Sequence, residues 1–193
     1  MVIAPPLLLR IVVVALVMGT ATQARAQGFI SPMLGFNFGG VSGCPQIRGC
    51  TDKQRSLSVS AGKFGTIFGA ETELAYTPDF FGDAPGLSSN VATLMGNVML
   101  APKAGPLRPY LLAGAGLMKT HFALKTASLL TFNDTAFGYT VGGGVFARLG
   151  DRFGLRGDLR YFHSFPDVRI VGFTLASETL NYSRISAGLV IQF

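Results

Sequence analysis

Two adjacent residues near the carboxy end, His163 and Ser164, have the side chains of a base and a nucleophile. A histidine activates a serine only when its ring lies within hydrogen-bond reach of the hydroxyl. The surrounding segment, 153–165, alternates apolar and polar residues, which predicts an extended strand. Because neighbouring side chains of a strand point to opposite faces, we expect the two residues to point apart. We therefore predict no catalytic residues and interpret His163 as a rim histidine near lipid headgroups.

Charged side chains set among apolar segments form a second chemical group. Each lies on the polar face of an alternating segment: Glu71, Glu73, Arg148, Arg156, Asp158, Arg160 and Arg184. Charges removed from water are tolerated only when they are paired and hydrogen-bonded. We predict a salt-bridge network in which Glu71 and Glu73 face arginines of the last two strands. A gated ion path or a ligand pocket is the alternative.

Cys44 and Cys50 are the only cysteines, and they flank a short segment that contains proline and glycine. In an exported protein this pattern predicts a disulfide that closes a loop. Neither histidine lies nearby in the sequence, so we expect no metal site. The chain also lacks a glycine-rich phosphate loop and a nucleophile elbow, and we expect no cofactor.

The first 26 residues have the pattern of a cleavable signal peptide. The pattern consists of a positive start, a short apolar run at 11–18 and Ala-Arg-Ala at 24–26. We expect cleavage between Ala26 and Gln27, which leaves residues 27–193 as one domain. The apolar run is too short for a spanning helix, which needs roughly 20 apolar residues. The net charge of +6 could suggest a nucleic-acid partner. Export separates the protein from nucleic acid, however, so we expect no such partner.

The remaining chain favours a membrane-spanning sheet. Charged residues make up 13%, against a usual share of roughly 25%. No run of 18 apolar residues follows the signal peptide, so no transmembrane helix is expected. Two-residue alternation recurs instead, in segments of about ten residues, as is typical of transmembrane β-strands. The eight predicted strands are 29–39, 55–64, 69–78, 91–101, 108–120, 136–149, 153–165 and 182–193.

The two faces of these strands differ in polarity. In the last one, Ile185, Leu189 and Ile191 share a face opposite Arg184 and Ser186. We expect the apolar faces to contact lipid and the polar faces to line a lumen, with inward glycines making room for larger side chains. A soluble barrel of lipocalin type would need the reverse arrangement.

The predicted connections alternate in length. Four are long, 40–54, 79–90, 121–135 and 166–181, and three are short, 65–68, 102–107 and 150–152. This is the layout of an outer-membrane barrel with long external loops and both termini in the periplasm. We expect aromatic girdles near the strand ends, made by Tyr76, Phe80, Phe81, Tyr110, Tyr139 and Tyr161.

Three segments carry a family resemblance: LRPYLLAGAGL at 107–117, GLRGDLRYFHSF at 154–165, and the last strand ending in Phe193. They resemble eight-stranded barrels of the OmpA/OmpX type, in the outer-membrane protein β-barrel domain family. The resemblance covers residues 28–193 and implies an all-β, antiparallel up-and-down barrel in a Gram-negative outer membrane. It also implies that Phe193 is part of the signal read by the barrel-assembly machinery. No peptidoglycan-binding domain follows, so we expect no OmpA-type tether.

Outer-membrane lipid A deacylases offer a weaker resemblance. They place a histidine and a serine on a barrel strand in a His-x-Ser-Asn pattern. Here the order is His163-Ser164-Phe165-Pro166, so the spacing differs and the asparagine is missing.

The expected function is non-enzymatic: a structural role in the envelope, or interaction and adhesion through the long loops. The expected partners are outer-membrane lipid and lipopolysaccharide, the assembly machinery, and an extracellular ligand or host surface. A small diffusion pore and a lipid A-modifying enzyme are the alternatives.

Overall fold

A computed structural model describes residues 27–40, 54–81, 87–124, 131–165 and 179–193. The predicted signal peptide lies outside these residues. So do Cys44 and Cys50, and their disulfide stays a prediction. No helix in the described part is long and apolar enough to cross a membrane.

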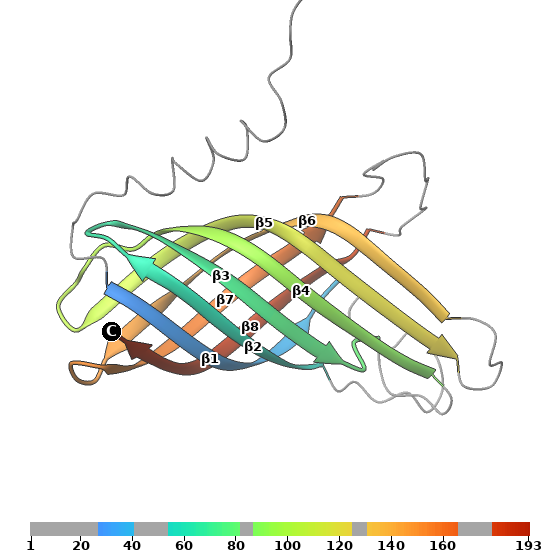
Figure 1. The fold of residues 1–193 in the computed structure, drawn as a ribbon, viewed down its shortest axis with the longest axis horizontal. Helices are drawn as coiled ribbons and strands as arrows, with labels where there is room; N and C mark the ends of the chain where they lie inside the picture. The colour runs from blue at the N-terminus through green and yellow to red at the C-terminus, as the bar shows by residue number, and fades with distance from the viewer. Residues whose placement is uncertain (1–26, 41–53, 82–86, 125–130, 166–178) are drawn as a thin grey trace, which may run out of the picture.

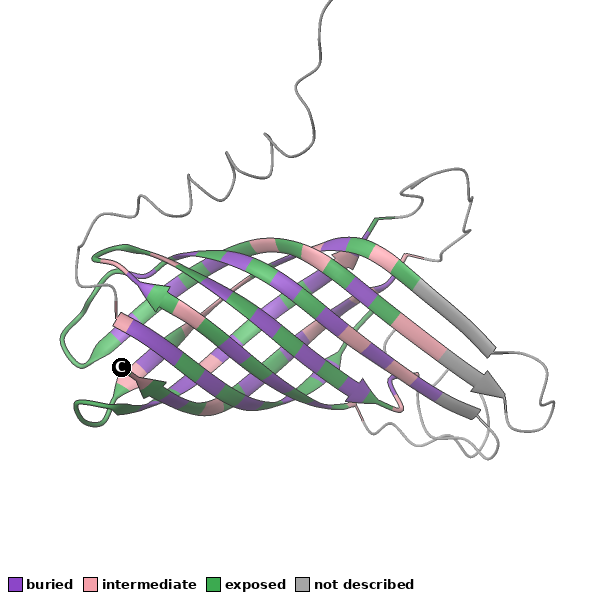
Figure 2. Ribbon diagram, in the orientation of Figure 1, coloured by how far each residue is buried: buried purple, intermediate pink, exposed green. Residues whose placement is uncertain are grey.

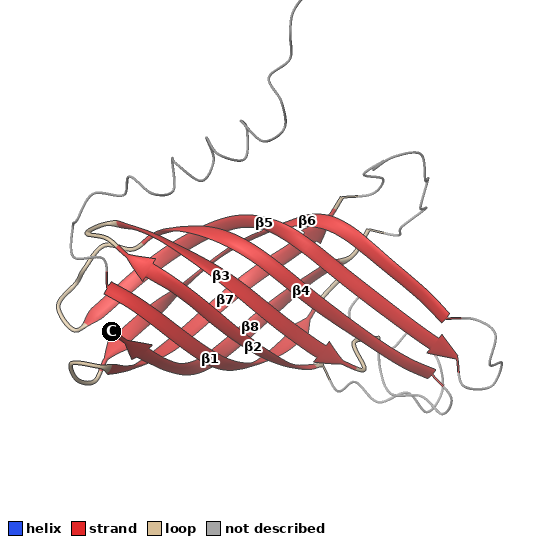
Figure 3. Ribbon diagram, viewed as in Figure 1, coloured by secondary structure: helices blue, strands red, loops and turns tan. Residues whose placement is uncertain are grey.

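The described chain forms one closed antiparallel barrel (Figures 1 and 3). Its strands are β1 (Gln27–Phe38), β2 (Arg55–Phe64), β3 (Phe68–Pro78), β4 (Leu87–Leu100), β5 (Leu107–Leu124), β6 (Thr131–Arg148), β7 (Phe153–Ser164) and β8 (Asn181–Gln192). Each strand pairs with the next along the chain, and β8 returns to pair with β1. Closure leaves every strand paired on both sides, as an apolar membrane requires of a spanning sheet.

The barrel has two different ends. We call the end that holds Gln27, Phe193 and the connections 65–67, 101–106 and 149–152 the terminal mouth. The opposite end is the distal mouth. At the terminal mouth Phe193 and Gly28 exchange two backbone hydrogen bonds of 3.0 Å, so the last residue helps to close the sheet.

The polarity of the faces is as predicted. Burial alternates along the strands, which gives the banded pattern of Figure 2. Leucine, isoleucine, valine and phenylalanine side chains dominate the exposed band, while serines and charges point into the lumen. Inward glycines make room there: a Cβ on Gly144 would lie 2.6 Å from the hydroxyl of Tyr110.

The predicted ends of three strands are wrong. β4 begins at Leu87 rather than 91, β5 continues to Leu124, and β6 begins at Thr131. Most of the predicted loop 121–135 is therefore strand, as are residues 87–90 of the loop 79–90. The sequence loses its alternation there, but backbone pairing continues and needs no apolar side chain.

The aromatic girdle prediction is wrong for two residues. Tyr76 and Tyr161 are exposed on the outer surface, but Phe80 and Tyr110 are buried inside the barrel. Tyr110 lies two residues from Arg108 and so shares its inward face.

Candidate functional site

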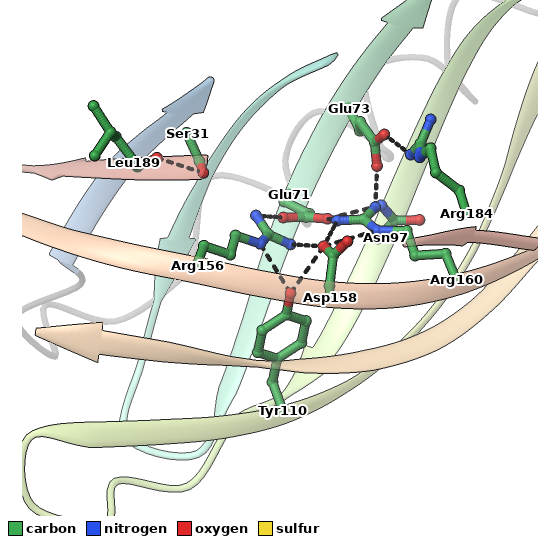
Figure 4. A network of polar contacts seen from close by, with 10 residues as sticks. All are labelled: Ser31, Glu71, Glu73, Asn97, Tyr110, Arg156, Asp158, Arg160, Arg184 and Leu189. Carbon is green, nitrogen blue, oxygen red and sulfur yellow. Dashed lines mark hydrogen bonds and ion pairs between the residues drawn. The ribbon is translucent and has the colours of Figure 1, made fainter. Parts of the chain in front are cut away.

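Six ionisable side chains meet in the middle of the lumen (Figure 4). Strand β3 supplies Glu71 and Glu73, which are two residues apart and share the inner face. Strand β7 supplies Arg156, Asp158 and Arg160 by the same spacing, and β8 supplies Arg184. Three carboxylates face three guanidinium groups, so the network is electrically neutral overall.

Glu71 joins two of the arginines. Its Oε2 accepts a hydrogen bond from Arg156 Nη1 at 2.8 Å, and its Oε1 lies 3.0 Å from Arg160 Nη2. Asn97 on β4 also donates to Oε1, at 3.0 Å. Both oxygens of the carboxylate therefore have donors, as a buried charge requires.

Arg160 is the centre of the network. It forms ion pairs with all three carboxylates, those of Glu71, Glu73 and Asp158. Its Nε and Nη2 both donate to Asp158 Oδ2, at 3.0 and 2.7 Å. Such charge-assisted bonds fix the guanidinium in one orientation.

Glu73 extends the network to the last strand. One of its oxygens pairs with Arg160 Nη1 and the other with Arg184 Nη2. Glu73 is the only carboxylate in the described chain that pairs with Arg184. Both side chains are excluded from solvent, so this link connects β3, β7 and β8 across the lumen.

Two members of the network were not predicted from the sequence. The hydroxyl of Tyr110 donates to Asp158 Oδ2 at 2.9 Å and accepts from Arg156 Nε at 2.9 Å. Asn97 binds Glu71, its directly opposite partner in the β3–β4 pairing. The inward position of each residue was the signal that could have identified it.

The prediction that Arg148 belongs to the salt-bridge network is wrong. Arg148 is exposed at the terminal mouth, where β6 ends. Its position on the inward-facing side of the strand is right, yet the lumen has ended at that level. Its side chain is exposed, and no carboxylate in the described chain forms an ion pair with it.

An aromatic cluster closes the lumen on the terminal side of the network. Phe29 and Phe64 stack at 4.6 Å, and Phe146 meets Phe64 edge-on at 4.8 Å. The guanidinium of Arg156 lies 4.7 Å from the centroid of the Phe146 ring. The network is therefore in direct contact with this apolar plug.

A second cluster closes the distal side. Phe162 stacks on Tyr182 at 4.8 Å, and Phe80 meets Tyr182 edge-on at 4.9 Å. Arg184 lies over Phe162 at 4.7 Å from the ring centroid. The lumen thus has three layers of buried side chains, apolar, ionic and apolar.

The pair of residues considered for catalysis is separated. His163 points outward among Tyr139, Tyr161 and Phe165, with ring centroids 5.1 to 6.4 Å away. Ser164 points inward, and its hydroxyl accepts the backbone N–H of Leu180 at 2.7 Å. A proton cannot pass directly between them, because the sheet lies between their side chains.

The described residues contain no group of three or more histidine, cysteine, aspartate or glutamate side chains that could hold a metal ion. The carboxylates in the lumen are instead neutralised by arginines, which occupy the positions that a cation would take.

Comparison with known proteins identifies the architecture. Residues 11–193 match the family described as outer membrane protein beta-barrel domain. No curated protein matches the chain significantly.

Several solved structures share the fold. Neisserial surface protein A is 15% identical with a TM-score of 0.61, and the alignment covers 87% of this chain and 97% of that one. Ail of Yersinia pestis, in complex with the heparin analogue sucrose octasulfate, is 12% identical with a TM-score of 0.54, over 87% and 99% of the two chains. The N-terminal barrel of Pseudomonas aeruginosa OprF is 15% identical with a TM-score of 0.52, over 86% and 97%.

Proposed function

Because this chain belongs to the outer membrane protein beta-barrel domain family and lies in a Gram-negative outer membrane, we propose that it is a closed, non-enzymatic scaffold. The scaffold carries an interaction surface at its distal mouth and contributes structurally to the envelope. In this family layout the terminal mouth faces the periplasm and the distal mouth faces outward.

The observation that carries the proposal is the three-layered lumen. An eight-stranded barrel has an interior just wide enough for side chains to fill. Here Arg160 and its three carboxylate partners fill the middle, and aromatic clusters fill both sides. A diffusion pore would need these layers to separate, which would leave buried charges unpaired. The closed interior favours a function on the outer surface.

The distal mouth offers such a surface. β5 and β6 pair from Leu107↔Ala147 to Ala123↔Thr131, whereas β6 pairs with β7 only as far as Gly138↔Ser164. Part of this hairpin therefore extends beyond its β7 neighbour (Figure 1). A spanning strand needs about 9–11 residues, and these two strands have 18 each, so the excess reaches outside the bilayer.

The structure of Ail suggests a class of ligand, because it contains a heparin analogue. We propose that this chain likewise presents its outer segments to an extracellular ligand or host surface. Lipopolysaccharide would surround the barrel at that level. Assembly would proceed through the last strand, with Phe193 as part of the signal read by the barrel-assembly machinery.

The experiment compares the whole barrel with a variant in which residues 41–53, 121–133 and 166–178 are each replaced by a short Gly-Ser turn, so that the end of the β5–β6 hairpin is removed as well. Both proteins are checked for folding by their shift in gel mobility on boiling. We expect the folded variant to lose adhesion of whole cells to a host surface while resistance of the envelope to detergent is kept. Unchanged adhesion would overturn the interaction surface.

Planar-bilayer conductance and lipid A mass test the alternatives. We expect no steady conductance from the purified protein and an unchanged lipid A mass when it is overexpressed. Steady channels would show a pore, and an altered lipid A mass would show an enzyme.

A further inference from the structure

The terminal mouth contains a small basic recess that the charge network does not use. The recess has a volume of about 80 Å³ and lies beside the β4–β5 connection. Lys103, Arg108 and Arg148 line it together with the amides of Gln27 and Gln192. Three cations thus surround a space large enough for a tetrahedral anion.

Arg108 is a fixed part of this recess. Its side chain is 9% exposed, and its guanidinium stacks on the Phe64 ring at 4.3 Å. Its Nε donates to the carbonyl of Ala101 at 2.8 Å, and its Nη2 donates to that of Gly65 at 2.6 Å. These contacts hold the charge in place, while Nη1 donates to no atom of the described chain.

The recess has no matching negative charge. No carboxylate in the described chain pairs with Lys103, Arg108 or Arg148, in contrast to the neutral network deeper in the lumen. Asp151 is the one acidic side chain of the three terminal-mouth connections, and it lines a neighbouring recess with Arg152. The partners of the Arg108 guanidinium are neutral carbonyls and an aromatic ring, so its charge is left uncompensated and would be stabilised by an anion in the recess.

The surroundings of the recess indicate where that anion comes from. Large apolar side chains are exposed around the same mouth: Ile67, Phe68, Leu100, Leu107, Leu149, Phe153 and Phe193. Such side chains sit in the apolar edge of the bilayer. Leu107 is one of them and also lines the recess, so the recess opens at headgroup depth although Arg108 and Arg148 point inward. Basic pockets between transmembrane helices bind anionic lipid headgroups at this depth, and the same charge attraction acts at the mouth of a barrel.

We propose that the recess binds the phosphate group of an anionic phospholipid in the periplasmic leaflet. Arg108 would supply the fixed donor, and Lys103 and Arg148 the mobile ones. The inference goes beyond the surface function proposed above and depends only on the barrel's position in the membrane.

The test uses the full barrel in nanodiscs that contain phosphatidylglycerol and phosphatidylcholine of equal chain length. Native mass spectrometry measures which lipid stays bound. We expect the wild type to prefer phosphatidylglycerol, and Lys103→Gln and Arg148→Gln each to weaken that preference about fivefold. Both residues are exposed, so these variants keep the fold.

Arg55→Gln is the matched control, because Arg55 is exposed at the opposite mouth. An equal loss of preference in this variant would overturn the proposal, as would a wild type that retains the two lipids equally. A second arm titrates inorganic phosphate into the detergent-solubilised barrel and follows its ³¹P signal. Binding of free phosphate without any lipid preference would refute the headgroup as the source.

Discussion

Replacing Glu73 by glutamine tests the charge network at the ion pair with Arg184, which has no other carboxylate partner in the described chain. Glu73 is fully buried and accepts from Arg160 with one oxygen and from Arg184 with the other. Glutamine keeps one acceptor oxygen but turns an NH₂ group toward an arginine, which can only donate. Arg184 then has no carboxylate, and the buried network carries a net positive charge.

Removing one partner of a buried ion pair destabilises a protein by about 3–5 kcal/mol. We expect that loss for Glu73→Gln. The double variant Glu73→Gln/Arg184→Gln restores neutrality, so its loss should be about 1–3 kcal/mol smaller than the sum of the two single losses. The matched control is Asp151→Asn, at an exposed turn of the terminal mouth, with an expected change within about 0.5 kcal/mol.

The assay is urea unfolding of the barrel in phospholipid vesicles. The folded fraction is read from the gel mobility of unboiled samples, and the free energy of unfolding from linear extrapolation. Two results would refute the reasoning. One is a loss below about 1 kcal/mol for Glu73→Gln, the magnitude of an exposed pair. The other is a double variant whose loss equals the sum of the single losses.

Further predictions concern packing, the lipid face and closure. Gly144→Ala should destabilise the barrel by about 1–3 kcal/mol in the same assay, because the new methyl group would clash with the backbone carbonyl of Gly157 and with the Tyr110 hydroxyl. Gly150→Ala, with open space around it, should be neutral. Leu159→Arg places a charge on the lipid-facing surface in the middle of the barrel and should destabilise it by about 2–4 kcal/mol. Leu149→Arg, at the terminal turn, should destabilise the barrel by at most about 1 kcal/mol. The wild type should stay folded in cold detergent and change its gel mobility on boiling; unchanged mobility would contradict a closed barrel.

The local pattern of the chain was enough to predict the architecture. Alternation with period two determines which side chains share a face, and it does not depend on the neighbouring strands. Leu189 and Ile191 could therefore be placed outward, and Arg184 inward, from the residue pattern alone. The separation of His163 from Ser164 follows from the same rule.

Strand ends were less predictable. The residues at 121–124 and 131–135 lose their alternation, yet they continue the β5–β6 hairpin. Backbone hydrogen bonds between the two strands hold that extension together, and such bonds do not need an apolar face. The pattern of side-chain polarity therefore does not predict where the backbone pairing of β5 and β6 ends.

The membership of the network was decided by the tertiary structure. The sequence placed Glu71, Glu73 and the arginines inside, but the strand stagger determines their relative heights along the barrel axis. That stagger brings Tyr110 to Asp158 and leaves Arg148 exposed at the terminal mouth. It also leaves Arg108 without a carboxylate partner in the described chain, and its guanidinium donates to backbone carbonyls instead. The face to which a side chain points is a local property of its strand. Its position along the barrel axis depends on the register of all eight strands, and only the closed barrel determines it.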